Sequence, residues 1–116
     1  MVLYHCVIEI KNDARALAFA SAAETWLGLL KTRGLIGDWR LFRRKLGLGS
    51  ERHGDFMLQI EVESLTHLDK AFSHLAQDSD IDPRSYELMH EMIQSADVGL
   101  YRPYPDPSQR EHVALI

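Results

Sequence analysis

The chain has a single cysteine, Cys6, and no apolar run near the roughly 20 residues that a bilayer requires. One cysteine excludes an internal disulfide and fits a reducing compartment, so we expect a cytoplasmic protein. The first residues, MVLYHCVIEIKND, have neither a basic segment nor a small-residue cleavage site, so they do not resemble a signal peptide. These absences predict a protein without a membrane partner.

Metal-ligand clusters and short catalytic motifs are also missing. His67 and His74 are seven residues apart, which does not match the i, i+4 pair of a helical zinc site. No glycine-rich phosphate loop joins a strand to a helix, and no Gly-x-Ser-x-Gly element occurs. We therefore expect no metal and no cofactor. Cys6 lies among apolar residues and is expected to be a buried, inert thiol.

Positive charge is scarce overall, because 13 Lys and Arg residues face 17 Asp and Glu residues for a net charge of −4. This balance argues against nucleic acid as a partner.

The 46% of apolar residues and the length of 116 residues are typical of one globular domain with its own core. We expect this domain at residues 1–104. A C-terminal tail, residues 105–116, ends in VALI and either packs on a partner subunit or frays.

Hydrophobic patterns predict seven elements in the order β-α-β-β-α(α)-β. Strands are expected at residues 2–11, 37–49, 56–64 and 96–105. Helices are expected at residues 14–33, 65–76 and 83–95. The first strand turns Tyr4, Cys6, Ile8 and Ile10 to one face, and the third turns Phe56, Leu58, Ile60 and Val62 to one face. These two apolar faces are expected to pack against the helices.

Capping residues and apolar stripes support the three helices. Asn12 or Asp13 can cap the first helix, and Ser64 can cap the second. Gly34 suits the left-handed position after the first helix, and the Asp-Pro pair at 82–83 favours the start of the third. The stripes expected to be buried are Phe19, Ala23, Trp26, Leu27 and Leu30 in the first helix, Leu65, Leu68, Phe72 and Leu75 in the second, and Tyr86, Met89 and Ile93 in the third.

This order predicts an α+β, ferredoxin-like fold: a four-stranded antiparallel sheet with helices on one face. The other face of the sheet has a mixed composition. Val7 and Met57 are too apolar for a wet surface, whereas His5, Gln59 and Glu61 are too polar for a dry core. A second copy of the sheet facing the first satisfies both groups, so we expect a homodimer.

The β-α-β-β-α-β order, the length and the transition EVESLTHLDKAF (residues 61–72) resemble the dimeric α+β barrel superfamily. Within it, the chain is similar to the stress-responsive A/B barrel proteins and to an uncharacterised bacterial branch. The resemblance covers residues 2–104 and implies a homodimeric α+β barrel with a cavity between the sheets. The superfamily includes small cofactor-free monooxygenases, so it implies no single chemistry, and this chain has no matched catalytic set.

The segment GDWRLFRRKLGLG, residues 37–49, concentrates cations in an acidic chain. Two pairings with the third strand are open. The first places two apolar residues on the core and the alternate residues beside Gln59 and Glu61: Trp39 and Leu41 inward, with Arg40, Phe42 and Arg44 outward. The second reverses these faces: Phe42 and Leu46 inward, with Leu41, Arg43 and Lys45 beside Glu61. We favour the first slightly, because it packs Trp39 and Leu41 on the core.

Either pairing puts one or two cations near Glu61. These cations can protect an edge strand from foreign pairing, form a bridge across a dimer interface, or bind an anion. His5 can shuttle a proton near neutral pH or serve as a hydrogen-bonded interface residue. The candidate ligand-binding residues are therefore His5, Arg40, Arg44, Gln59, Glu61 and Tyr101.

The expected function is binding of a small anionic or aromatic molecule, in a cavity between or beside the sheets. A cofactor-independent enzyme is compatible with this expectation, although no catalytic residue can be named. The alternative is a non-catalytic, stress-associated or interaction protein whose sheets close tightly on each other.

Overall fold

The computed structural model describes residues 1–45, 53–77 and 83–105. The elements follow in the predicted order: β1 (Val2–Ile10), α1 (Ala16–Thr32), β2 (Trp39–Arg43), β3 (Phe56–Val62), α2 (Leu65–Gln77), α3 (Pro83–Glu91) and β4 (Ile93–Tyr101). Of the predicted C-terminal tail, only Pro105 belongs to the described residues. Within the described ranges, no helix combines the length and the apolar character needed to span a membrane.

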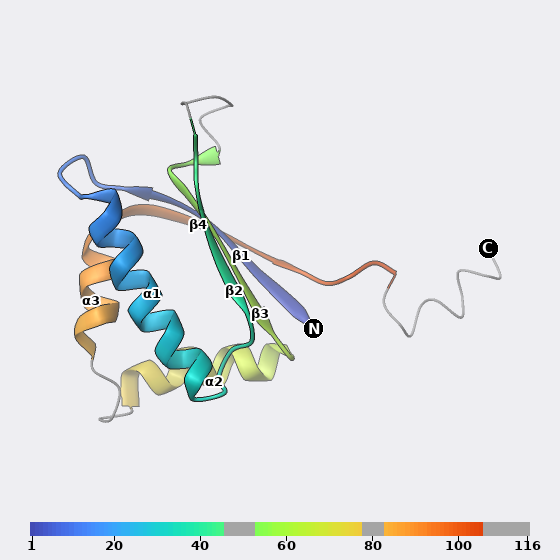
Figure 1. Cartoon of the computed structure of the whole chain (residues 1–116). Coiled ribbons are helices and arrows are strands. Elements are labelled where there is room, and N and C mark those ends of the chain that lie inside the picture. The colour runs from blue at the N-terminus through green and yellow to red at the C-terminus, as the bar shows by residue number, and fades with distance from the viewer. Residues whose placement is uncertain (46–52, 78–82, 106–116) are drawn as a thin grey trace.

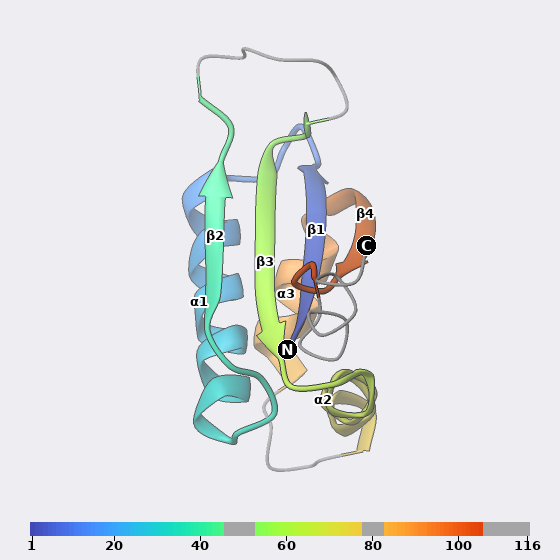
Figure 2. The same ribbon diagram turned by 90° about the vertical axis from the view of Figure 1, so that its right-hand side faces the viewer.

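The strands form one antiparallel sheet in the order β2-β3-β1-β4. Helices α1 and α3 lie side by side on one face of the sheet, and α2 runs across one end of it (Figure 1). Figure 2 views the opposite face, in front of which no described helix lies. This arrangement confirms the predicted α+β, ferredoxin-like fold, and we call the uncovered side the open face.

The core lies between the sheet and helices α1 and α3. All five residues of the predicted α1 stripe are buried, and the even-numbered residues of β3 are buried as predicted: Phe19, Ala23, Trp26, Leu27 and Leu30; Phe56, Leu58, Ile60 and Val62. The rings of Phe19 and Phe56 join the two layers, with centroids 4.8 Å apart. Full burial of each large apolar side chain contributes about 1.5–3 kcal/mol, so this layer contact stabilises the domain.

The hairpin adopts the first of the two predicted pairings. Trp39 lies opposite Ile60 and Leu41 lies opposite Leu58, so both side chains pack against the core. Arg40 and Phe42 consequently belong to the open face. Strand β2 is an edge strand, as predicted, which fits the protective role of its exposed arginines. The predicted end of this strand, residues 46–49, is not among the described residues.

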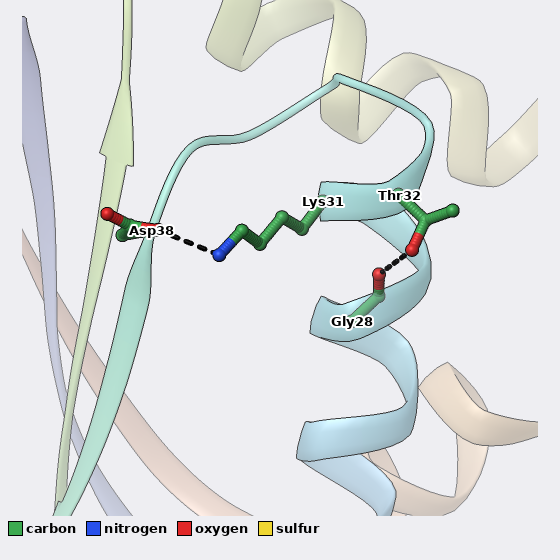
Figure 3. A network of polar contacts seen from close by, with 4 residues as sticks. All are labelled: Gly28, Lys31, Thr32 and Asp38. Carbon is green, nitrogen blue, oxygen red and sulfur yellow. Dashed lines mark hydrogen bonds and ion pairs between the residues drawn. The ribbon is translucent and has the colours of Figure 1, made fainter.

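A polar contact links the end of α1 to the start of β2 (Figure 3). The Lys31 ammonium donates to the Asp38 carboxylate at 2.8 Å, and the Thr32 hydroxyl donates to the Gly28 carbonyl at 2.9 Å. Hydrogen bonding and charge from Lys31, and to a smaller degree the charge of Arg40, hold the pKa of Asp38 below its usual range. Gly34, which lies between these elements, has φ +73°, the left-handed conformation predicted for it.

The predicted cap of α1 is wrong, whereas the predicted cap of α2 is confirmed. The Ala14 amide donates to the Lys11 carbonyl at 2.9 Å, so Asn12 and Asp13 form a turn, and α1 begins later. Arg15 occupies the N-cap position without a side-chain hydrogen bond. At α2, the Ser64 hydroxyl accepts the His67 amide at 3.2 Å, which is the expected capping bond.

Two further predictions about the helices need correction. Helix α3 ends at Glu91 rather than near residue 95, because the Met92 carbonyl accepts the Lys11 amide at 2.9 Å and the chain enters the sheet there. Ile93 is therefore in β4, opposite Ile10, and β4 both begins and ends earlier than expected. In α2, Leu65 is 49% exposed instead of buried, while Ala71 is buried and Leu68 packs on the core. The side chains of Phe72 and Leu75 are outside the described part.

Candidate functional site

Four of the six predicted site residues form a continuous row on the open face. The strand register places Arg40 opposite Gln59, and Gln59 opposite His5. His5 lies opposite Gly99 of β4, and the Tyr101 ring meets the His5 ring edge-on at a centroid distance of 5.8 Å. The row therefore runs across all four strands, as the alternation of the strands predicted for residues that share a face.

Tyr101 lies over Gly99. A Cβ atom at Gly99 would be 3.0 Å from Cε2 of the Tyr101 ring, so the ring uses the space that glycine leaves. The Tyr101 side chain is nevertheless 56% exposed, and Phe42 at the other edge of the sheet is 44% exposed. The open face thus has exposed aromatic groups at both edges and polar groups between them.

Arg44 and Glu61 do not come together as expected. The Arg44 amide donates to the Asp55 carbonyl at 2.8 Å, whereas the Glu61 amide donates to the Asp38 carbonyl at 2.9 Å. Six residues of extended chain separate these positions along β3, which is about 20 Å. Of the one or two cations expected near Glu61, Arg44 is therefore not one, because the paired part of the hairpin is too long, whereas Arg40 lies opposite Gln59, two residues from Glu61. Glu61 lies two residues beyond Gln59 along β3, opposite Leu3 of β1.

A second candidate site lies on the other side of the sheet, between the sheet and helices α1 and α3. This helix-side cavity has a volume of about 170 Å³. Its lining is mostly apolar and comes from β1, β3, β4, α1 and α3: Tyr4, Cys6, Ile8, Trp26, Leu58, Ile60, Tyr86, Met89, His90, Ile93 and Ala96. None of the six residues predicted from the sequence belongs to this lining.

One buried polar group in the cavity wall is unsatisfied. Trp26 is only 3% exposed. Its Nε1 is inaccessible to solvent and has no hydrogen-bond partner among the described residues. An unpaired buried donor costs about 1–3 kcal/mol, and native proteins satisfy almost all such groups. Because Nε1 itself is not accessible, this cost belongs to the packed core and not to the open volume of the cavity.

The two polar side chains that β1 contributes to the cavity lining, Tyr4 and Cys6, are held in their neutral forms. Burial, and then the neighbouring Cys6 and Tyr86, raise the pKa of Tyr4 to about 12. Burial also raises the pKa of the Cys6 thiol, which opposes a role as a nucleophile. Cys6 is therefore a buried thiol, as expected. At neutral pH both groups are therefore uncharged, and a hydrogen bond between them is among the causes of their shifts.

A stack of three rings leads from the buried wall to the cavity mouth. The Trp26 and Tyr86 rings have centroids 5.2 Å apart, and the Tyr86 and His90 rings are nearly parallel at 5.5 Å. His90 and Ala96 are exposed residues of the lining, so the cavity opens between α3 and β4. Sequence patterns assigned Trp26 and Tyr86 to the core. The signal in the sequence that could have indicated a site was this set of two aromatic side chains and one imidazole on the same side of the fold: Trp26, Tyr86 and His90.

Metal-ligating side chains do not cluster in the described part of the chain. No group of three His, Cys, Asp or Glu side chains in the described ranges lies close enough together to hold an ion. His67 contacts two residues that precede it in the chain: its Nδ1 lies 3.0 Å from the Ser64 hydroxyl, and its Nε2 lies 3.3 Å from the Glu63 carboxylate. These contacts belong to the N-terminal cap of α2.

Several solved structures have the same fold at low sequence identity. The Arabidopsis thaliana protein At3g17210 is 10% identical, with a TM-score of 0.71 over 91% of this chain and 98% of its own. SnoaB, a cofactor-independent oxygenase from Streptomyces nogalater, is 10% identical, with a TM-score of 0.65 over 91% and 95%. A dimeric ferredoxin-like protein of unknown function from Jannaschia sp. CCS1 is 12% identical, with a TM-score of 0.64 over 89% and 100%.

These likenesses confirm the ferredoxin-like fold. No functionally curated protein matches the chain in sequence. A family model, by contrast, matches the chain over residues 1–116. The chain belongs to that family, DUF6614, which is described as a family of unknown function.

Proposed function

We propose that the chain binds a small aromatic molecule in the helix-side cavity and forms a homodimer through the open face. The observation that supports binding most directly is the cavity itself, whose lining is mostly apolar and includes a few polar side chains. A binding site of this kind combines apolar walls with a few polar groups that orient the ligand. The cavity of about 170 Å³ is large enough for one aromatic ring, because a cavity of about 150 Å³ binds benzene.

The open face supports the dimer. Phe42 and Tyr101 are exposed there, on either side of the Arg40–Gln59–His5 row. A self-complementary contact would bury these aromatic rings and give Arg40 a carboxylate of the second copy to bind. Structural neighbours described as dimeric are consistent with this arrangement. In this proposal, the six residues predicted from the sequence belong to the subunit contact, where they can also meet an anionic ligand.

The neighbour described as a cofactor-independent oxygenase makes an enzymatic role compatible with the fold. A likeness of 10% identity does not transfer that activity, so the proposal is limited to binding. We retain the expectation of a cytoplasmic location, which agrees with the free thiol of Cys6.

Ligand binding is tested by thermal unfolding with two neutral aromatic probes, toluene and 4-methylanisole. We expect the unfolding temperature to rise with probe concentration, because a molecule that binds only the folded state stabilises it. Ala96→Phe should abolish this rise by filling the cavity mouth. Val98→Phe is the matched control, since Val98 lies on the same face of β4 outside the cavity lining. No stabilisation of the wild-type protein by either probe would overturn the proposal for the cavity.

Sedimentation velocity tests the dimer separately. We expect the mass of a dimer at micromolar concentration, unchanged by Ala96→Phe. A monomer at all accessible concentrations would refute the subunit contact and leave the cavity proposal to its own test. A stable dimer that binds no probe would instead favour the alternative, a non-catalytic interaction protein.

A further inference from the structure

We propose that the ligand of the helix-side cavity is a single aromatic ring with an aliphatic chain that ends in a carboxylate. The ring occupies the cavity, the chain lies along β4, and the carboxylate meets Arg102. This inference depends on the proposed function, because it names the ligand class of the same cavity. Three observations lead to it: an apolar strip on β4, the continuity of that strip with the cavity mouth, and the cation beyond its other end.

Strand β4 exposes an apolar strip on the helix side of the sheet. The strip consists of Ala96, Val98 and Leu100, and the register places Val98 opposite the buried Cys6 of β1. Opposite residues of paired strands share a face, so the strip lies on the side of the helices. Val98 is nevertheless 47% exposed and Leu100 is 50% exposed, because β4 runs on past α3 (Figure 1). The strip is therefore an apolar surface that the described helices leave about half uncovered.

The strip begins in the mouth of the cavity. Ala96 belongs to both, since it lines the cavity and is also exposed to solvent. Tyr4, another residue of the cavity lining, lies opposite Leu100 at the far end of the strip. Alternate residues of a strand are about 7 Å apart, so the strip extends over about 13 Å. A molecule whose ring fills the cavity can therefore continue along β4 without entering the core.

Arg102 occupies the next position of the same alternation, just beyond the end of β4. It lines a recess together with the buried Val2 of β1 and the first residues of α2, so it lies on the helix side as well. A guanidinium group binds carboxylates through paired donors. Glu63 lines the same recess, but its carboxylate lies 3.3 Å from Nε2 of His67 and its side chain is 84% exposed, so water screens its charge. A ligand carboxylate at this end stays in water and gains an ion pair.

The shape of the strip favours a chain over a second protein. The strip is one strand wide, because β4 is an edge strand. Its three partly exposed side chains offer far less than the roughly 800 Å² that each partner of a stable protein interface buries. The subunit contact proposed above uses the opposite face of the sheet, so a dimer leaves the strip accessible. An apolar track with one cation at its end matches a chain with one anionic end.

Calorimetry with phenylacetate, 4-phenylbutyrate and 6-phenylhexanoate tests the chain, and toluene reports on the cavity alone. Full burial of a methylene group raises affinity about fourfold, and the strip covers one side of a chain, so we expect about a twofold gain per added methylene. Leu100→Gln should reduce this gain and leave the affinity for toluene within about twofold, because Leu100 is outside the cavity lining. Leu17→Gln, a change at an exposed leucine of α1, is the matched control and should behave as the wild type.

The carboxylate is tested with 6-phenyl-1-hexanol, which has the same chain and no charge. The wild type should bind 6-phenylhexanoate about threefold more tightly than the alcohol, as expected for an exposed ion pair, and high salt should remove the difference. Arg102→Gln should bind the two probes equally. Arg15→Gln, a change at the exposed arginine of the α1 N-cap, should keep the preference of the wild type.

The outcomes separate the inference from the proposed function. Binding of toluene with no gain along the phenylalkanoate series would overturn the inference and leave the cavity proposal intact. A preference for the carboxylate that persists in Arg102→Gln would overturn the role of Arg102. Loss of the dimer in sedimentation of Leu100→Gln would show that a second copy covers the strip, which also overturns the inference. Failure of toluene and of every phenylalkanoate to bind the wild type would overturn both. Because Leu100 and Arg102 are exposed, we expect both variants to fold, and circular dichroism provides the check.

Discussion

Two glycines with positive φ provide a quantitative test of how the hairpin is packed. Gly54 has φ +58° and Gly34 has φ +73°. A Cβ atom at Gly54 would lie 2.8 Å from Cγ1 of Val7 and 3.0 Å from the Ile8 carbonyl oxygen, whereas a Cβ atom at Gly34 would meet nothing within 4 Å. Alanine at either position has the same backbone strain, so the difference between the two variants isolates the steric contact.

The expected magnitudes follow from these contacts. The left-handed conformation costs an alanine about 1–2 kcal/mol, which is the whole effect expected for Gly34→Ala. Gly54→Ala adds an overpacking cost of about 1–3 kcal/mol, because the Ile8 carbonyl belongs to the backbone of the central strand and cannot move aside. We therefore expect Gly54→Ala to lower the free energy of unfolding by about 2–5 kcal/mol in total.

Urea unfolding followed by tryptophan fluorescence and circular dichroism measures both variants. Protein concentration must be the same in each experiment, because the stability of a dimer depends on it. The slope of the free energy with urea should be unchanged, which would show that only stability differs. Equal losses for the two variants would refute the close approach of residue 54 to β1. A larger loss for Gly34→Ala would refute it as well.

Three further predictions test the two faces of the sheet. Because the folded pKa of Tyr4, about 12, is above its ordinary value of 10, its contribution to stability is present below pH 10 and is lost between pH 10 and 12. The free energy of unfolding should fall over that range, by less than the full shift implies because Tyr4 is partly exposed, and ultraviolet titration should detect one tyrosine that ionises late; a titration identical to that of an unfolded tyrosine would contradict this. Phe42→Asp should dissociate the dimer in sedimentation, whereas Leu88→Asp, an equally exposed change on α3, should not; equal behaviour would place the contact elsewhere. Trp26→Phe should destabilise the fold by less than the roughly 3 kcal/mol at which losses for truncated buried aromatic residues begin, because it also removes a buried donor without a partner among the described residues; a larger loss in urea unfolding would contradict this.

The layers of the fold could be predicted from the sequence because the periodic signals are strong. Phe56, Leu58, Ile60 and Val62 alternate without interruption, and the α1 stripe contains only residues that are buried in the structure. Such patterns depend on the geometry of a single element, so they need no knowledge of the rest of the chain. The pairing of β2 was left open, since both alternatives placed apolar residues inward, and packing of Trp39 on the core decided it.

The cap of α1 and the end of α3 could not be predicted, because both depend on contacts between elements. The turn closed by Lys11 and Ala14 delays the helix past Asn12 and Asp13. The Lys11 amide also bonds to Met92, which draws the chain into β4 soon after α3 ends. No local propensity encodes a hydrogen bond between residues 11 and 92. These differences also explain why Ile93, expected on a helix, is a residue of the cavity lining.

The two candidate sites differ in how visible they are in a sequence, and β1 explains the difference. Its odd-numbered residue His5 faces outward among polar neighbours, so composition alone indicated that face as a candidate site. Its even-numbered residues Tyr4 and Cys6 line the cavity, yet they belong to the pattern of a buried core. A cavity exists where packing is incomplete, which depends on the path of α3 and β4 rather than on residue type. Both faces are parts of one central strand, so a change at Tyr4 or His5 must be tested for binding and for subunit contact together.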